Sequence, residues 1–289
     1  MRMTLVVAIF AVASALAGAD GFMVPFVRGV DLYEPNQNAI LAWNGKEEIL
    51  ILSTNVRASK PTKVMQIFAS RAKPDVRMVD PSIFVRASEI LKAHDSRKLR
   101  ADPSLRAPAI GRAAGQEPAG RVEKHQLLGR HDVATVEVQR PEGFAEWVHD
   151  YLDSQGAENL VLPSELDATI KGYIEKGFHW FVYDIVELNT DVRTNEPLLY
   201  RFASDRLFYP LVYTQTMDTS PAIKLLVITR NFLWDYPELP RQNIRVGFEG
   251  TNAARADVRD ELVTLYPAEL GSILADLVDL MGSVNPVRM

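Results

Sequence analysis

The hydrophobic pattern of Leu32–Val56 predicts a β-hairpin. Two β-rich runs in this stretch flank Asn44-Gly45, and Asn-Gly is favoured in a two-residue type I′ turn because both central residues need a positive φ angle. Such a loop would place Ile40 opposite Ile49, whereas a three-residue loop would shift the register, and the sequence leaves both open. Away from the turn both faces of the hairpin are apolar, so we expect other parts of the chain to cover it on both sides.

Helical periodicity appears in three stretches before residue 180. Asp80-Pro81 predicts a helix start, with aspartate as N-cap and proline at the first helical position. In Pro141–Asp153 the apolar residues recur at i, i+3, i+4, i+7 and i+8, which is typical of an amphipathic helix. Ser164 and Asp167 resemble a capping box that opens another helix, and Gly177 would end it.

The other apolar runs predict strands. Phe178–Leu188 is apolar on both faces, as expected of a central strand, and short runs separated by turn residues follow it. Such spacing predicts an antiparallel meander. The further predicted strands are Lys63–Ala69, Asp132–Val138, Leu198–Phe202, Leu207–Thr214, Ile223–Thr229 and Ile244–Phe248, and helices are predicted at Arg255–Leu265 and Pro267–Met281. Strands grouped with strands and helices with helices predict an α+β fold of mainly antiparallel sheets and paired helices.

The N-terminus has the pattern of a secretory signal peptide. Arg2 precedes an apolar stretch at Leu5–Ala17, and small residues around Ala17 and Ala19 fit cleavage sites. The stretch is shorter than the ~20 apolar residues of a membrane helix. We therefore assign residues 1–19 to a signal peptide and expect export to the periplasm, the extracellular space or the cell surface. We expect no membrane span in the mature chain.

Composition shifts divide the remaining chain. We predict a β-rich N-terminal lobe with one helix at 20–95 and a C-terminal α+β lobe at 131–289. Between them, 96–130 is a basic insertion or linker rich in proline, alanine and glycine. Two interpretations of this insertion stay open, a solvated loop and a basic patch that binds an anionic partner at the cell surface.

Composition and charge exclude several classes of site. The chain has no cysteine, which excludes disulfides, thiol nucleophiles and thiolate zinc sites. Its 37 acidic residues outnumber 32 basic ones. A net negative charge disfavours nucleic acid as a partner, because nucleic-acid binding depends on neutralising phosphates.

The candidate catalytic residues are two carboxylates, Asp184 and Glu187, in the otherwise apolar strand at Phe178–Leu188. One of them would serve as a general acid if burial raised its pKa; alternatively, each marks a strand end or pairs with an arginine such as Arg201. Complete catalytic templates such as G-x-S-x-G, H-E-x-x-H or a phosphate-binding loop do not occur in the sequence.

The histidines give little indication of a metal site. Three of them precede an aspartate, at His94, His131 and His149, and adjacent residues on a strand point to opposite faces. His179 lies beside Trp180 and is interpreted as a core histidine. We predict neither a metal nor a cofactor.

A loop of large aromatic residues offers a candidate binding surface. Phe232, Trp234 and Tyr236 alternate within a segment rich in proline. If exposed, they would stack on sugar rings or dock a protein partner; if buried, they form a lid over the core.

Four passages resemble a secreted prokaryotic family called domain of unknown function 2330. They are the signal peptide running into Asp20-Gly21-Phe22, the hairpin Glu34–Leu52, the Pro74-Asp75-Val76 approach to a helix, and His131–Leu152 with the strands that follow it. The resemblance implies export and surface association, and it supplies no catalytic residues. Family members that carry early cysteines and a C-terminal membrane anchor differ from this sequence, which has neither.

These observations favour an exported protein without enzymatic activity that acts by binding or as a surface-associated structural component. A cell-surface glycan or protein is the expected partner. The alternative is a secreted hydrolase acting on polysaccharide or peptide, with Asp184 or Glu187 as its acid or base.

Overall fold

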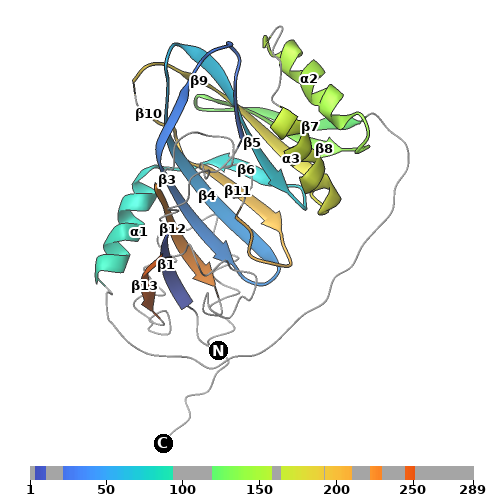
Figure 1. Ribbon diagram of the computed structural model, residues 1–289. Coiled ribbons are helices and arrows are strands. Elements are labelled where there is room, and N and C mark those ends of the chain that lie inside the picture. The colour runs from blue at the N-terminus through green and yellow to red at the C-terminus, as the bar shows by residue number, and fades with distance from the viewer. Residues whose placement is uncertain are drawn as a thin grey trace, which may run out of the picture.

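The computed structural model describes residues 4–10, 22–93, 119–157, 164–191, 193–209, 222–229 and 245–250, and its strands form two sheets (Figure 1). The eight-stranded sheet has the order β13-β1-β12-β3-β4-β11-β6, and β10 pairs with β4 beside this path. Its strands are β1 (Thr4–Phe10), β3 (Leu32–Trp43), β4 (Glu47–Ala58), β6 (Asp75–Met78), β10 (Arg193–Thr194), β11 (Leu198–Ala203), β12 (Ala222–Thr229) and β13 (Arg245–Gly250).

The five-stranded sheet has the order β2-β5-β9-β8-β7 and is antiparallel throughout. Its strands are β2 (Phe22–Pro25), β5 (Thr62–Ser70), β7 (Gly120–Leu128), β8 (His131–Val138) and β9 (Trp180–Leu188). Three helices are described, α1 (Ser82–Ala93), α2 (Phe144–Ser154) and α3 (Ser164–Glu175). In Figure 1, α2 and α3 lie on the five-stranded sheet and α1 lies beside the other sheet. The fold is α+β with mostly antiparallel strands, as predicted.

Strand alternation gives each face of the five-stranded sheet its own core. In β9, Phe181, Tyr183 and Ile185 belong to the cluster that also contains Phe144 of α2 and Ile170 of α3. Val182 belongs to a second cluster, shared with residues of the eight-stranded sheet such as Leu50, Leu198 and Leu225. Even-numbered residues of β9 therefore face the eight-stranded sheet, and odd-numbered residues face the helices.

The predicted hairpin is confirmed as β3 and β4, with a different register at its turn. Ile40 pairs with Ile51, two residues beyond the partner that a two-residue loop would give. The Asn44 side chain explains the longer loop, because its Oδ1 accepts hydrogen bonds from the backbone N–H groups of Lys46 and Glu47, each at 2.8 Å. A shift of two residues keeps every side chain on its predicted face.

Both faces of this hairpin are buried, as predicted. Ile40 and Ile51 on one face and Leu41 and Leu50 on the other are at most 1% exposed. The hairpin is therefore central scaffold, covered on both sides.

The helix signals are confirmed at three ends. Asp80 Oδ1 accepts a hydrogen bond from the Ser82 backbone N–H at 2.7 Å, which caps α1 and lowers the pKa of Asp80. Helix α3 begins at Ser164, and Gly177 follows its end with a φ angle of 85°. Glycine adopts this left-handed conformation without a steric cost.

The strand order differs from the predicted meander. Strand β9 pairs with β5 and β8, β11 pairs with β4 and β6, and β12 runs parallel to β3. Strand β9 thus lies in the five-stranded sheet, whereas the strands that follow it, β10 to β13, lie in the eight-stranded sheet. Residues 207–209 form no strand, and residues 210–214 lie outside the described residues.

Both sheets combine strands from the two predicted lobes. The eight-stranded sheet takes β3, β4 and β6 from 20–95 and β10 to β13 from 131–289, and the five-stranded sheet likewise contains strands of both stretches. Strand β7 lies within 96–130, where the sequence indicated little regular structure. Strand β1 lies within the predicted signal peptide and pairs with β12 and β13. The two predicted C-terminal helices lie outside the described residues.

Within the described ranges, none of the helices has the length and apolar character needed to cross a membrane.

Candidate functional site

The candidate carboxylate Asp184 lies at the centre of the five-stranded sheet. It pairs with Gln66 of β5 on one side and with Val133 of β8 on the other. As an even-numbered residue of β9, it points toward the eight-stranded sheet, and it is only 2% exposed. The strand pattern that makes β9 apolar on both faces therefore places one carboxylate between the sheets.

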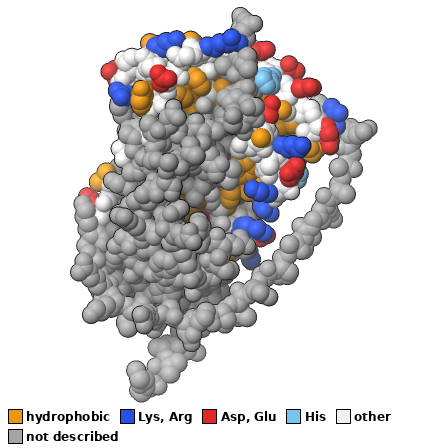
Figure 2. All heavy atoms as spheres, viewed as in Figure 1, with side chains coloured by type: hydrophobic (Ala, Val, Ile, Leu, Met, Phe, Trp, Pro, Cys, Tyr) orange, Lys and Arg blue, Asp and Glu red, His pale blue; other side chains and the backbone are white. Residues whose placement is uncertain are grey.

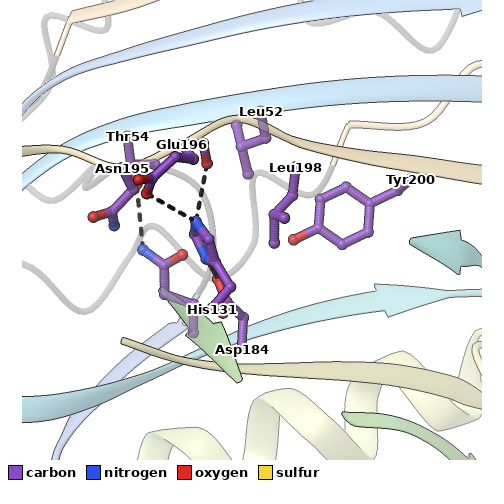
Figure 3. Close-up of a pocket in the computed structure, with 9 residues that line it drawn as sticks. Leu52, Thr54, His131, Asp184, Asn195, Glu196, Leu198 and Tyr200 are labelled. Atoms are coloured by element: carbon purple, nitrogen blue, oxygen red, sulfur yellow. Dashed lines mark hydrogen bonds and ion pairs between the residues drawn. The ribbon is translucent and has the colours of Figure 1, made fainter. Parts of the chain in front are cut away.

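His131, the first residue of β8, is the partner of Asp184. Its ring nitrogen Nδ1 lies 2.8 Å from Asp184 Oδ2, and the other ring nitrogen, Nε2, lies 3.0 Å from the backbone carbonyl oxygen of Glu196. Figure 3 shows the imidazole between these two partners, with Leu198 and Tyr200 to one side. His131 is 2% exposed, so both ring nitrogens are engaged inside the protein.

A charged pair at the surface borders the buried pair. Arg130 donates hydrogen bonds to both carboxylate oxygens of Glu196, at 2.9–3.1 Å, and this contact lowers the pKa of Glu196. The neighbouring Asn195 is bound to β4: its backbone N–H donates to the Thr54 carbonyl, and its carbonyl accepts from the Ser53 hydroxyl. The loop before β11 thus contacts both sheets.

The space around His131 is small. Nine residues line a cavity of about 10 Å³, namely Leu52, Thr54, Gln66, His131, Asp184, Asn195, Glu196, Leu198 and Tyr200. Roughly 10–15 Å³ holds one water molecule. Asp184 Oδ1 and Asn195 Nδ2 have no hydrogen-bond partner among the described residues, so a single water is the ligand that suits this cavity in size and polarity.

Hydrogen-bonding rules restrict how the pair is protonated. A carbonyl oxygen only accepts hydrogen bonds, so His131 Nε2 carries a proton and donates it to Glu196. The 2.8 Å contact between Nδ1 and Asp184 Oδ2 then requires one further proton between these two atoms. The pair is therefore held by one shared proton, whichever of the two atoms carries it.

Burial and mutual contact both favour keeping that proton. Burial raises the pKa of Asp184 above its ordinary value. Burial alone would lower the pKa of His131, but the hydrogen bond and charge of Asp184, together with Glu196, outweigh this effect and raise it. The folded pair thus keeps its shared proton to a higher pH than separate side chains would.

The other candidate carboxylate, Glu187, has a different environment. It is exposed and lies opposite Lys63 of β5. Arg201, which the sequence offered as a partner for either carboxylate, instead pairs with Glu47 at 2.9 Å. The structure therefore does not bring Asp184 and Glu187 together, and regular strand alternation separates them as expected.

The remaining histidines are dispersed. His179 is exposed, so its interpretation as a core histidine is wrong; β9 begins at the next residue, Trp180. His125 contacts Asp132 on the β7–β8 hairpin, and His149 is half-buried on α2. No group of three histidine or carboxylate residues that could hold a metal ion occurs in the part of the chain that the structure describes.

The aromatic candidates Phe232, Trp234 and Tyr236 lie outside the described residues, as does His94.

Glu48 is a second buried carboxylate, which the sequence pattern did not single out. It faces the inter-sheet core from β4, is fully buried, and its Oε2 accepts the backbone N–H of Phe208 at 2.7 Å. Burial raises its pKa well above the ordinary value, and the Phe208 hydrogen bond only partly offsets this. The folded state thus binds a proton that the unfolded chain loses at neutral pH.

We expect the substitution Glu48→Gln to stabilise the protein at pH 7 by on the order of 2 kcal/mol, because an amide accepts the Phe208 hydrogen bond and is neutral without taking up a proton on folding. The gain should shrink toward pH 4, where the unfolded chain also protonates Glu48. Urea unfolding at both pH values measures it. Glu47→Gln is the matched control: its partner Arg201 is partly exposed, so a change within about 1 kcal/mol is expected. A loss of stability in Glu48→Gln would contradict the argument.

Charges on the surface of the β7–β8 hairpin are largely paired. Lys73 and Arg121 contact Glu123, Arg121 also contacts Glu137, and Lys124 lies 3.5 Å from Asp75. Figure 2 shows acidic and basic side chains interspersed on the described part of this face. Within 119–130, paired charges of this kind do not make a basic patch, and residues 96–118 of the predicted insertion lie outside the described residues.

Local sequence patterns mark only part of this site. Asp184 was detectable as a carboxylate inside an apolar strand. The role of His131 was not detectable, because its partner Asp184 lies 53 residues away in the sequence. Glu48 lies beside the hairpin turn, opposite Trp43, and no local sequence pattern marks it as buried.

Comparisons with known proteins place the chain in a family. No curated protein matches it. Among solved structures, baculovirus P35 is similar with a TM-score of 0.32 and 12% sequence identity, covering 62% of this chain and 57% of that chain. P35 in complex with caspase-8 gives a TM-score of 0.27 and 12% identity, covering 58% and 53%. The sequence profile of an uncharacterized protein family conserved in bacteria (DUF2330) matches residues 14–279, so this chain belongs to that family.

Proposed function

We propose that this protein is exported and acts without catalysis, as a binding protein or structural component at the cell surface. The observation that carries the non-catalytic part is the environment of His131 and Asp184. This pair combines residue types common in catalysis, yet both side chains are 2% exposed and both ring nitrogens are already bonded within the protein.

The size of the cavity supports the same conclusion. Substrate pockets usually enclose roughly 300–1,000 Å³, whereas the cavity at His131 measures about 10 Å³. A sugar ring or peptide side chain does not fit beside Asp184. The pair is better explained as a structural contact between the two sheets, and the second carboxylate, Glu187, lies on the surface away from it.

The proposed export rests on the N-terminal pattern and on the resemblance described above. Cleavage after Ala17 or Ala19 would remove strand β1, which pairs with β12 and β13. In an exported protein, the final sheet would therefore form without Thr4–Phe10. We expect the secreted protein to begin at Gly18 or Asp20. The intact mass of the exported chain, measured by mass spectrometry, determines its first residue. A chain that stays inside the cell with residues 1–19 attached would overturn the export proposal.

Binding without turnover is tested on the mature chain from Asp20. Arrays of bacterial polysaccharides and of peptides serve as probes for binding. Each probe that binds is then incubated with the protein and analysed for cleavage. Binding with unchanged probes is the expected result. Cleavage that Asp184→Asn abolishes would instead support the hydrolase alternative, and Glu187→Gln tests the second carboxylate in the same assay.

A further inference from the structure

The contacts of His131 and Arg130 join the β7–β8 hairpin to a loop of the other sheet. His131 is the first residue of β8 in the five-stranded sheet, and Arg130 lies in the turn before it, whereas Glu196 lies in the loop between β10 and β11. That loop is bound in turn to the eight-stranded sheet, because Asn195 N–H donates to the Thr54 carbonyl at 3.2 Å. The Val79 N–H, beside β6, donates to Pro197 at 3.0 Å.

We propose that His131 and Asp184 form a proton-dependent latch between the two sheets. While they share one proton, the loop Asn195–Pro197 is held against the β7–β8 turn. When that proton is lost as the pH rises, the loop is released and solvent reaches the polar cavity. This latch does not depend on whether the protein is exported or what it binds.

The number of ring protons explains the release. A neutral imidazole carries a single N–H. After the shared proton is lost, that N–H serves either Asp184, through Nδ1, or the Glu196 carbonyl, through Nε2. The first choice leaves the Nε2 lone pair facing a carbonyl oxygen, and the second leaves the Nδ1 lone pair facing a buried carboxylate. Either arrangement places two acceptors in contact, which favours separation of the loop from the turn.

The other titratable groups near His131 do not account for the proposed loss of a proton. The charged neighbours are Glu196, whose Oε2 lies 3.9 Å from His131 Nε2 and pairs with Arg130, and Asp132, which follows on β8 and contacts His125. The Tyr200 phenol also lines the cavity, and the ordinary pKa of tyrosine is about 10. The other lining residues, Leu52, Thr54, Gln66, Asn195 and Leu198, do not titrate. The pair of His131 and Asp184 is therefore the group near this loop that loses a proton as the pH rises above the ordinary histidine pKa of about 6.5.

Hydrogen exchange of the full chain tests the latch directly. The Asn195 and Val79 amides report on the loop, because their acceptors are Thr54 and Pro197. After correction for intrinsic exchange rates, we expect the opening equilibrium of both amides to increase by up to about tenfold per pH unit once the shared proton titrates. An opening equilibrium that, after this correction, does not change between pH 6 and pH 9 would overturn the proposal.

Two variants separate the latch from a general loosening of the fold. In Asp184→Asn, the introduced amide donates to Nδ1 and leaves Nε2–H for Glu196, so no proton can be lost and the pH dependence should disappear. Glu196→Gln keeps the backbone carbonyl but weakens the contact with Arg130 and removes a carboxylate that raises the pKa of His131. Opening should therefore increase, and its rise with pH should keep the same slope but begin at a lower pH. A pH slope that persists in Asp184→Asn contradicts the latch.

A measurement on the wild-type protein tests the latch without relying on the folding of any variant. Nitrogen-15 chemical shifts of the His131 ring report whether one or both ring nitrogens carry protons. We expect His131 to titrate above the ordinary histidine pKa of about 6.5, together with the change in amide exchange. Titration at or below this value, or at a pH unrelated to the exchange, rules the latch out.

Discussion

Replacing Asp184 with alanine is expected to lower the free energy of unfolding by about 3–5 kcal/mol, the typical cost of removing one partner from a buried ion pair. The side chain is 2% exposed and bonds His131 at 2.8 Å. Its removal leaves Nδ1 of His131 without an acceptor and enlarges the cavity between the sheets. Urea unfolding of the wild-type and variant proteins at pH 7 measures the difference.

The matched control is Asp184→Asn, which keeps the volume and the hydrogen bond to Nδ1. Its stability at pH 7 should stay within about 1.5 kcal/mol of the wild type. A loss as large as that of Asp184→Ala would mean that charge, rather than the hydrogen bond and the packing, dominates at this site. A negligible effect of the alanine variant would show that the buried pair is not formed in solution.

The same pair sets the direction of the pH dependence. The folded pair keeps one proton, and the unfolded chain loses the equivalent proton from histidine above about pH 6.5. Unfolding above this pH therefore releases a proton, and the free energy of unfolding contributed by the pair decreases as pH rises toward the folded pKa. Between about pH 4 and 6.5 the contribution is fully present. In Asp184→Asn this part of the slope should vanish, while the part due to Glu48 remains.

Replacing Phe144 with alanine is expected to cost about 3–5 kcal/mol, the range for truncating a buried aromatic side chain. Phe144 is fully buried, and its ring centroid lies 5.3 Å from that of Phe181 and 5.6 Å from that of Trp147. It fixes the first turn of α2 to the outer face of the five-stranded sheet. Thermal and urea unfolding measure the cost.

Leu127→Ala provides the comparison for Phe144→Ala. Leu127 lies on the edge strand β7 and is 76% exposed, so its truncation should change stability by no more than about 0.5 kcal/mol. A Phe144→Ala cost as small as this would contradict the packing of α2 on the sheet. A large cost for Leu127→Ala would instead indicate that another surface covers β7.

Local chemistry made the individual elements predictable. Asp80 and Gly177 mark helix ends because one accepts a hydrogen bond from a free backbone N–H and the other adopts a positive φ angle. The apolar residues on both faces of Leu32–Val56 predicted a hairpin buried on both sides, and the structure confirms it. Its register escaped prediction, because the Asn44 side chain closes a longer loop than Asn-Gly alone would indicate.

The buried pair was only half predictable. A carboxylate inside an apolar strand marks Asp184 from sequence alone. Its partner depends on the β8–β9 register, which places Val133 opposite Asp184 and brings His131 within 2.8 Å. His131 and Asp184 are 53 residues apart in the sequence. The register between their strands is set by the packing of both sheet faces, and no local residue pattern encodes it.

The sequence alone determined the α+β class, the helix ends, the two-sided burial of the hairpin and the family of this chain. Only the tertiary structure decided that β9 and β11 lie in different sheets, that β12 runs parallel to β3, and that His131, Asp184 and Glu196 meet. The physical reason is the range of the interactions. Caps, turns and alternation act within a few residues, whereas strand order and side-chain pairing depend on how distant segments share one buried surface.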